Sequence, residues 1–216
     1  MSPTPALRPA VLTGPLRPHR RPSDLARRLL GLFGWTVDAP GVPAEQGVIL
    51  VYPHTSNWDF VVGLMAKWAV GIELRFWGKD SLFKAPLLGH WMRWIGGVGV
   101  DRSSPHGIVA DTVSQMQGAA ARGERFWLAA APEGTRSLKS GWRTGAYQVA
   151  VQAGVPVGLC YFDFQQRVVS VTRFVMLTGD VQADFAAFAD YLGPRVGKRP
   201  ELASPIQPRS VPGPRL

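Results

Sequence analysis

Short apolar runs alternate with segments of helical periodicity along the body of this chain, and this alternation constrains the fold most strongly. Strands are predicted over 48–52, 74–77, 98–100, 126–130, 157–164 and 168–175. Helices are predicted over 24–35, 57–70, 81–95 with an interruption at Pro86, 108–121, 145–153 and 184–192. Strands alternating with helices indicate a single α/β domain, with a largely parallel mixed sheet flanked by helices. The last two strands are close enough in sequence to pair antiparallel.

Proline and positive charge gather at the two ends of the chain. Six of the 19 prolines lie in 1–22 and six more in 194–216. Residues 1–28 carry six arginines against Asp24, and residues 192–216 carry five basic residues against Glu201, whereas 29–191 is neutral. We therefore expect disordered basic tails over 1–22 and 194–216 around a domain at 23–193. A net charge of +9 confined to tails argues against a basic nucleic-acid-binding face.

The chain contains one cysteine, Cys160, which excludes an intramolecular disulfide and any multi-cysteine metal site. Cys160 lies mid-strand among apolar neighbours and is interpreted as a core residue. The His-Glu-x-x-His pattern of zinc hydrolases is also absent. We predict neither a metal nor a cofactor.

Three of the four histidines have an aspartate five residues later: His19 and Asp24, His54 and Asp59, His106 and Asp111. His19 falls in the basic tail, and His106 follows a Ser-Ser-Pro turn. Only His54 lies between a predicted buried strand and a predicted helix, where α/β sheets place their chemistry. A general base oriented by a carboxylate is one interpretation of His54 and Asp59, and a histidine that caps the helix is the other.

A second polar block, Ala-Pro-Glu-Gly-Thr-Arg-Ser over 131–137, follows the predicted strand 126–130. Gly134 allows close backbone approach, Arg136 offers a planar fork for phosphate, and Thr135 adds a hydroxyl donor. Glu133 could accept from a substrate hydroxyl or hold Arg136 in place, but for these residue types in isolation the default interpretation is a polar turn with a local Glu–Arg ion pair. A third segment, 96–102, ends in Asp101 and Arg102, which could form an ordinary ion pair at a strand end.

Taken in this order, these segments resemble the glycerolipid acyltransferases of the 1-acylglycerol-3-phosphate acyltransferase type. The resemblance covers about half of the chain, from position 50 to 157. It rests on His54-Thr-Ser-Asn-Trp-Asp59, on 77–89 with 97–102, on Pro-Glu-Gly-Thr-Arg-Ser over 132–137, and on Val-Pro-Val over 155–157. The resemblance implies that His54 is the general base and Asp59 its orienting carboxylate. It also implies that Arg102, Glu133, Gly134, Thr135 and Arg136 bind the phosphate-bearing acceptor.

The resemblance further implies transfer of an acyl chain from acyl-CoA or acyl carrier protein to a lysophospholipid hydroxyl. The expected acceptor is 1-acylglycerol-3-phosphate, which gives phosphatidic acid in phospholipid biosynthesis. Three departures from the family pattern bear on the acceptor: Pro53 replaces an asparagine, Ala131 and Gly99 replace phenylalanines, and a short helix at 24–35 replaces a long N-terminal membrane helix. The alternative is an acyltransferase with another acceptor, such as a different lysophospholipid or an aminolipid.

Two other classes of protein explain the sequence less well. A serine hydrolase of the α/β type would carry Gly-x-Ser-x-Gly, which is absent. A nucleic-acid-binding protein would use the basic tails and leave the three polar strand ends without a role. We therefore expect an enzyme that has no nucleic-acid partner.

The helix predicted over 24–35 is amphipathic and too short to cross a bilayer. Its apolar face contains Leu25, Leu29, Leu32 and Phe33, and Trp35 stands at its end. Together with the basic tails, it predicts peripheral attachment to anionic lipid on the cytoplasmic side of the cell membrane. Trp91 and Trp94 either extend this surface or pack in the core.

Overall fold

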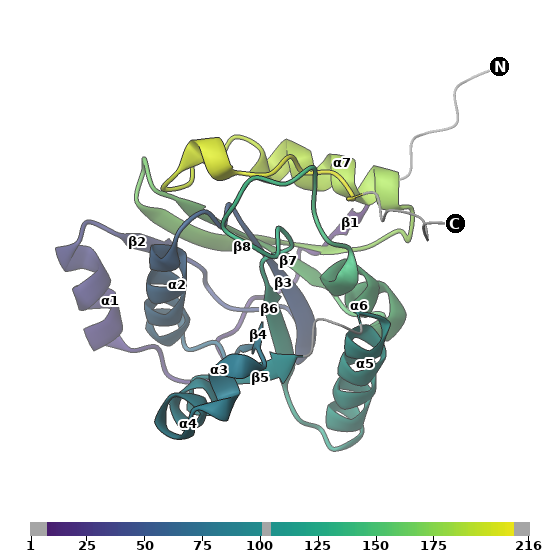
Figure 1. The fold of residues 1–216 in the computed structure, drawn as a ribbon, viewed down its shortest axis with the longest axis horizontal. Coiled ribbons are helices and arrows are strands. Elements are labelled where there is room, and N and C mark those ends of the chain that lie inside the picture. Colours follow the sequence, from purple (N-terminus) through teal and green to yellow (C-terminus); the bar gives the residue numbers. More distant parts are fainter. Residues whose placement is uncertain (1–7, 101–104, 210–216) are drawn as a thin grey trace.

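One mixed sheet forms the centre of the molecule in the computed structural model, which describes residues 8–100 and 105–209 and all their side chains except those of Pro105 and His106 (Figure 1). Seven strands follow the order β1-β8-β7-β3-β6-β4-β5, and β2 pairs separately with β8. The strands β7, β3, β6, β4 and β5 run parallel, whereas β8 is antiparallel to β7 as expected. The strands are β1 (Ala10–Val11), β2 (Thr36–Asp38), β3 (Gln46–Tyr52), β4 (Arg75–Lys79), β5 (Gly97–Val100), β6 (Phe126–Ala130), β7 (Val157–Asp163) and β8 (Val168–Met176).

Helices cover both faces of this sheet, so the α/β class is confirmed. In Figure 1, α1 and α2 lie on one side of the parallel strands and α5 and α6 on the other, with α7 across β7 and β8. The helices are α1 (Asp24–Leu32), α2 (Asn57–Val70), α3 (Ser81–Lys84), α4 (Pro86–Trp94), α5 (Pro105–Ala121), α6 (Gly145–Ala153) and α7 (Val181–Leu192), followed by a 3-10 turn at Pro200–Leu202.

Alternate residues of the central strand β3 point into two separate cores. Val48 and Leu50 pack with the core on the side of α5, α6 and α7. Ile49 points the other way, into the core that includes Leu30 of α1 and Val62 of α2. A strand buried on both faces has no solvent side, which is why β3 reads as a continuous apolar run.

The helix boundaries follow local capping signals. α2, β6 and α6 have the predicted bounds, whereas α7 begins at Val181 because the Asp180 carboxylate accepts from the backbone N–H groups of Gln182 and Ala183. α1 ends at Leu32, earlier than predicted, because Gly34 adopts a φ of +73°.

Trp35 therefore leaves the helix and turns into the core, which corrects the expectation that it faces a membrane. Its side chain is 9% exposed, and its ring centroid lies 4.8 Å from that of Phe164 in an edge-on contact.

The described parts of both tails pack against the domain, which corrects the expectation that they are disordered. In the N-terminal tail, Ala10 and Val11 pair with the edge strand β8, and Arg17 forms a two-way backbone bridge with Val42. In the C-terminal tail, Trp142 donates its backbone N–H to Gln207. Sheet edges and loops offer unpaired backbone groups to distant segments, and composition does not report such partners.

The path of the chain sets where a ligand can bind. β3 is followed by α2 on one face of the sheet, whereas β6 is followed by a loop and then α6 on the other face. β3 and β6 are neighbours, paired from Gln46 with Phe126 to Leu50 with Ala130. Connections that leave neighbouring strands toward opposite faces open a crevice at their carboxyl ends.

Candidate active site

The loop between β3 and α2 holds His54 against Asp59. Ser56 caps α2, and Asp59 Oδ2 closes the capping box by accepting from the backbone N–H of Ser56 at 2.8 Å. The same Oδ2 lies 3.2 Å from His54 Nδ1. Ser56 and Asp59 therefore cap the helix, so the interpretation of His54 as the capping residue is wrong, and its imidazole faces the Asp59 carboxylate instead.

This geometry suits a general base. A carboxylate at Nδ1 favours the tautomer that carries its proton there, which leaves the Nε2 lone pair to accept one. The Asp59 side chain is 1% exposed and that of His54 is 19% exposed. Asp59 Oδ1 is buried and has no hydrogen-bond partner among the described residues. With few donors around it, the carboxylate gains more from an imidazolium beside it.

Glu133 is buried and joins the loop that carries His54 to the C-terminal segment. Its Oε2 accepts from the backbone N–H of His54 at 2.5 Å, and its Oε1 accepts from that of Ser204 at 2.8 Å. Glu133 is 0% exposed, so the expectation that it contacts a substrate hydroxyl or Arg136 is corrected. Burial raises the pKa of this carboxyl, and the two backbone donors partly offset that rise.

The rest of the 131–137 block forms a tight turn, of which only Arg136 and Ser137 are exposed. Gly134 has a φ of +70°, and a Cβ there would lie 2.9 Å from Nε of Arg143. Thr135 and Ser137 share a hydroxyl hydrogen bond of 3.2 Å, and Arg136 is exposed at the tip. The sharp turn thus presents Arg136 beside the loop that carries His54.

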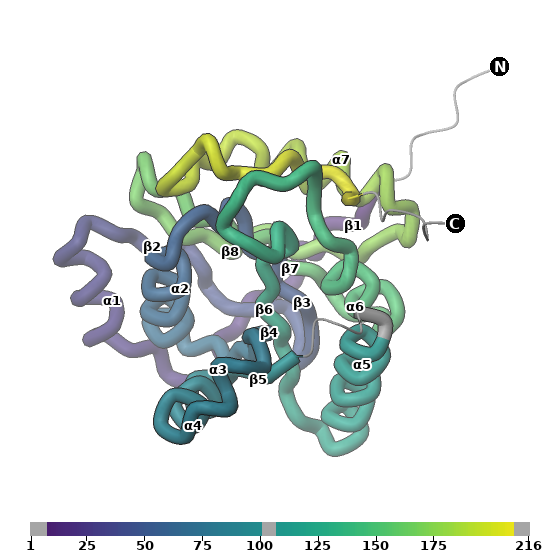
Figure 2. Tube along the Cα trace, in the orientation of Figure 1, coloured from purple at the N-terminus to yellow at the C-terminus, as the bar shows by residue number. Residues whose placement is uncertain are grey.

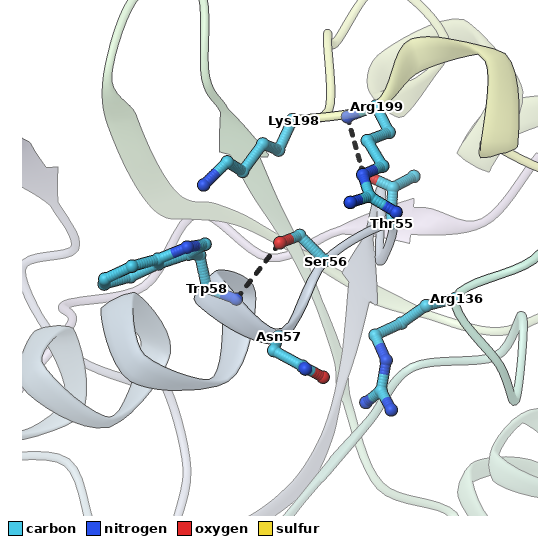
Figure 3. Close-up of a pocket in the computed structure, with 7 residues that line it drawn as sticks. All are labelled: Thr55, Ser56, Asn57, Trp58, Arg136, Lys198 and Arg199. Carbon is cyan, nitrogen blue, oxygen red and sulfur yellow. Dashed lines mark hydrogen bonds between the residues drawn. The ribbon is translucent and has the colours of Figure 1, made fainter.

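A pocket of about 250 Å³ lies next to His54, at the start of α2 (Figure 3). Arg136, for which the resemblance implies phosphate binding, is one of the residues that line it. Two further cations from the C-terminal segment line it as well, and sequence reasoning missed them because they had been assigned to a disordered tail. The lining residues are Thr55, Ser56, Asn57, Trp58, Arg136, Lys198 and Arg199.

The other candidate residues lie away from this pocket or outside the described part of the chain. Arg102 lies outside the described residues. The strand before it, β5, is separated from β6 by β4. His19, expected to be unsupported, is held in place because its Nδ1 accepts from the backbone N–H of Glu73 at 3.0 Å.

Cys160 is buried in β7, and burial raises its pKa to about 12, so its thiol is protonated at neutral pH. Over 8–100 and 105–209, no group of three or more acidic, histidine or cysteine side chains is placed to hold a metal ion.

Comparisons with known proteins identify relatives of this chain. Two curated relatives are 1-acyl-sn-glycerol-3-phosphate acyltransferases: that of Escherichia coli is 31% identical over 139 residues, and that of Salmonella typhimurium is 30% identical. Each alignment covers 60% of this chain and 54% of the relative, so the chain spans about half the length of the curated relatives it matches.

A solved structure shares the fold. It is a 1-acyl-sn-glycerophosphate acyltransferase from Thermotoga maritima, with a TM-score of 0.52 and 16% identity, and it covers 77% of this chain and 73% of its own. The sequence model of the family described as Acyltransferase matches residues 37–162, which include the His54–Asp59 loop and the 131–137 turn. This match extends over more than half of the chain, and the protein therefore belongs to the Acyltransferase family.

Proposed function

We propose that this protein transfers an acyl chain from acyl-CoA or acyl carrier protein to the hydroxyl of 1-acylglycerol-3-phosphate, giving phosphatidic acid. The contact between His54 and Asp59 beside a cationic pocket carries this proposal. A base next to a hydroxyl acceptor and cations next to its phosphate are what this reaction requires. The names of the two curated relatives support the same acceptor.

The reaction proceeds by direct attack of the acceptor on the thioester. His54 Nε2 takes the hydroxyl proton while the hydroxyl oxygen bonds to the thioester carbonyl carbon. Asp59 stabilises the imidazolium that forms. The tetrahedral intermediate then expels the thiolate, and the imidazolium returns the proton to that sulfur. No acyl-enzyme intermediate is required, since the acceptor itself is the nucleophile.

A screen of acceptors tests this proposal. Purified protein is given one labelled acyl-CoA or one labelled acyl carrier protein. Each donor is combined with 1-acylglycerol-3-phosphate (lysophosphatidic acid), another lysophospholipid or an aminolipid. We expect lysophosphatidic acid to give the highest kcat/KM. A clear preference for a neutral headgroup or an aminolipid would replace this acceptor with the alternative one while leaving acyl transfer in place.

We also propose that the enzyme reaches its lipid substrates by peripheral attachment on the cytoplasmic side of the membrane. Along the described part of the chain, no helix is long and apolar enough to span a bilayer. On α1, Ala26 and Leu30 face the core, whereas other apolar side chains of this segment are open to solvent. These are Leu25, Leu29 and Leu32 of the helix and Phe33 directly after it, which are 69%, 39%, 80% and 72% exposed.

The helix α4 offers a second set of exposed apolar side chains. Leu87 is 89% exposed and Trp94 is 70% exposed, and Leu88 and Trp91 are also exposed. Trp94 packs beside Trp68 of α2, with ring centroids 6.1 Å apart, so α4 is tied to the helix that also supports α1. Exposed tryptophans and leucines on short helices are typical of interfacial attachment.

Liposome flotation tests this attachment. Leu29→Glu with Phe33→Glu should reduce binding to anionic liposomes and lower activity on membrane-embedded acceptor, while activity on detergent-dispersed acceptor is retained. The matched control is Leu138→Glu with Val151→Glu, which places the same charges on exposed apolar residues elsewhere. If the first variant stays fully bound at high salt, the attachment surface does not include α1.

A further inference from the structure

The C-terminal segment 195–204 lies over the site and is fastened to both of its loops (Figure 2). Arg199 donates its backbone N–H to Thr55 Oγ1 at 3.2 Å, and Ser204 donates its own to Glu133 at 2.8 Å. The start of the segment is held by the backbone N–H of Phe164, which donates to the carbonyl of Val196 at 2.8 Å. The segment is therefore a fixed wall of the site.

A glycine allows this wall to approach the His54 loop closely. A Cβ on Gly197 would lie 2.8 Å from Thr55 Oγ1 and 3.1 Å from Cβ of Pro53, which is closer than ordinary packing allows. Only a residue without a side chain fits there. The close approach places the next two side chains, Lys198 and Arg199, at the pocket beside His54.

Three positive side chains from two distant segments surround this pocket. Figure 3 shows Lys198 and Arg199 on one side and Arg136 on the other, with the start of α2 between them. Lys198 Nζ lies 4.8 Å from the ring centroid of Trp58. The pocket lining contains no carboxylate, and none of the ion pairs found among the described residues includes Arg136, Lys198 or Arg199.

Like charges gathered around one small pocket repel each other, and an anion placed among them removes that repulsion. Arginine binds phosphate with two parallel hydrogen bonds, lysine adds a compact charge, and the first turn of a helix favours an anion. The geometry points to a phosphate-binding site in which Lys198 and Arg199 join Arg136. This assignment rests on the proposed function, and the phosphate belongs to the lysophospholipid acceptor or to the CoA donor.

Calorimetry tests the binding without requiring turnover. The probes are glycerol 3-phosphate, which mimics the acceptor headgroup, and adenosine 3′,5′-bisphosphate, which mimics the phosphate end of CoA. The variant Lys198→Ala with Arg199→Ala should weaken binding of one of these probes about tenfold or more. Arg122→Ala with Arg125→Ala is the matched control, because it removes the same charge at the amino end of β6. Unchanged binding of both probes relative to this control would overturn the assignment.

Kinetics then identify the source of the phosphate. A rise of about tenfold or more in the KM for lysophosphatidic acid assigns the site to the acceptor. A similar rise in the KM for acyl-CoA, without one for an acyl-pantetheine donor, assigns it to CoA. The variant Lys198→Gln with Arg199→Gln keeps part of both aliphatic side chains and should weaken binding as the double alanine variant does. The variant Arg199→Lys should retain part of the binding.

The assignment and the proposed function can fail separately. If the wild-type protein acylates a different lysophospholipid and the double variant loses phosphate binding, only the acceptor in the proposed function is wrong. If it acylates lysophosphatidic acid with unchanged KM values in every variant, the proposed function stands and the phosphate site does not.

Discussion

Charged residues are arranged differently at the two ends of the parallel strands. At the amino ends of β3, β4 and β6, exposed cations are paired with carboxylates: Arg125 with Glu45, Arg122 with Glu124, and Arg20 with Glu73. At the carboxyl ends of β3 and β6, three cations share one pocket, and the nearby carboxylates Asp59 and Glu133 are buried and bonded to other groups. Paired charges need no ligand, whereas unpaired ones around a pocket provide a site for an anion.

The largest effect is expected from the histidine pair itself. His54→Ala and Asp59→Asn should lower acyl transfer about a hundredfold or more, because both act on the proton of the acceptor hydroxyl. The asparagine still offers an oxygen to the backbone N–H of Ser56, so the start of α2 should persist. A thiol-release assay measures the rates, with His106→Ala as the control that shares the spacing to Asp111. Full activity in His54→Ala, with loss in His106→Ala, would place the chemistry elsewhere.

The next effect concerns the unpaired cations. Arg136→Ala should raise the KM for a phosphate-bearing acceptor about tenfold or more, since it removes a charge-assisted contact of about 1.5–3 kcal/mol. Arg136→Lys should restore only part of the affinity because an ammonium lacks the planar fork. Steady-state kinetics with each substrate varied in turn measure both constants. A rise confined to the acyl donor would contradict binding of the acceptor's phosphate by Arg136.

A smaller effect is expected from the buried carboxylate that joins the loops. Glu133→Gln puts an amide N–H₂ against a backbone donor, either His54 or Ser204, and should lower the free energy of unfolding by about 1–3 kcal/mol. Because Glu133 positions His54, kcat should fall while the KM for the acceptor stays unchanged. Urea unfolding and kinetics provide the two measurements, with the exposed Glu201→Gln as control. A raised KM with normal stability would instead mean that Glu133 contacts the acceptor.

The smallest effect is expected from His19, which lies at the amino ends of the strands, where no binding site is expected. Burial and the charge of Arg125 lower the pKa of His19 below its usual 6.5, although Glu45 and Glu73 partly oppose this. The unfolded chain then binds a proton more readily than the folded one, so this contribution to stability is present above pH 6.5 and is lost as the pH falls through the lowered pKa.

His19→Asn should remove this pH dependence, and the difference should be less than about 1 kcal/mol because the ring is only half-buried. Urea unfolding of both proteins at pH 7.5 and 5.5 measures the difference. If wild type gains stability over His19→Asn on acidification, the pKa of His19 is raised instead of lowered. Acyl transfer should stay near the wild-type rate in this variant, since His19 lies far from the proposed base along the strand direction.

Several parts of the site were predictable because their signals are local. A buried strand, a helix cap and an acidic residue in the first helical turn lie within residues 48–59, and these local features bring His54 close to Asp59. A distant residue, Glu133, then adds a hydrogen bond to the His54 backbone. The turn at Gly134 is also local, since its positive φ favours glycine.

The role of Glu133 and the positions of Lys198 and Arg199 were not predictable. Glu133 is polar and lies at a strand end, which indicates exposure, yet the backbone donors that satisfy it come from His54 and Ser204. Proline and arginine in the tails indicate disorder, yet a sheet edge and two loops supply hydrogen-bond partners for the parts that the structure describes.

By itself, the sequence determined the order of the strands and helices except the short strands β1 and β2, together with the α/β class, the resemblance to a family and the histidine pair. These follow from periodicity and from contacts between near neighbours in the chain. Only the tertiary structure decided which residues surround the pocket, because Arg136 and the segment at 198–199 meet there across 62 positions of sequence. Such a meeting depends on how the whole sheet brings the loops together, and no short stretch of residues records it.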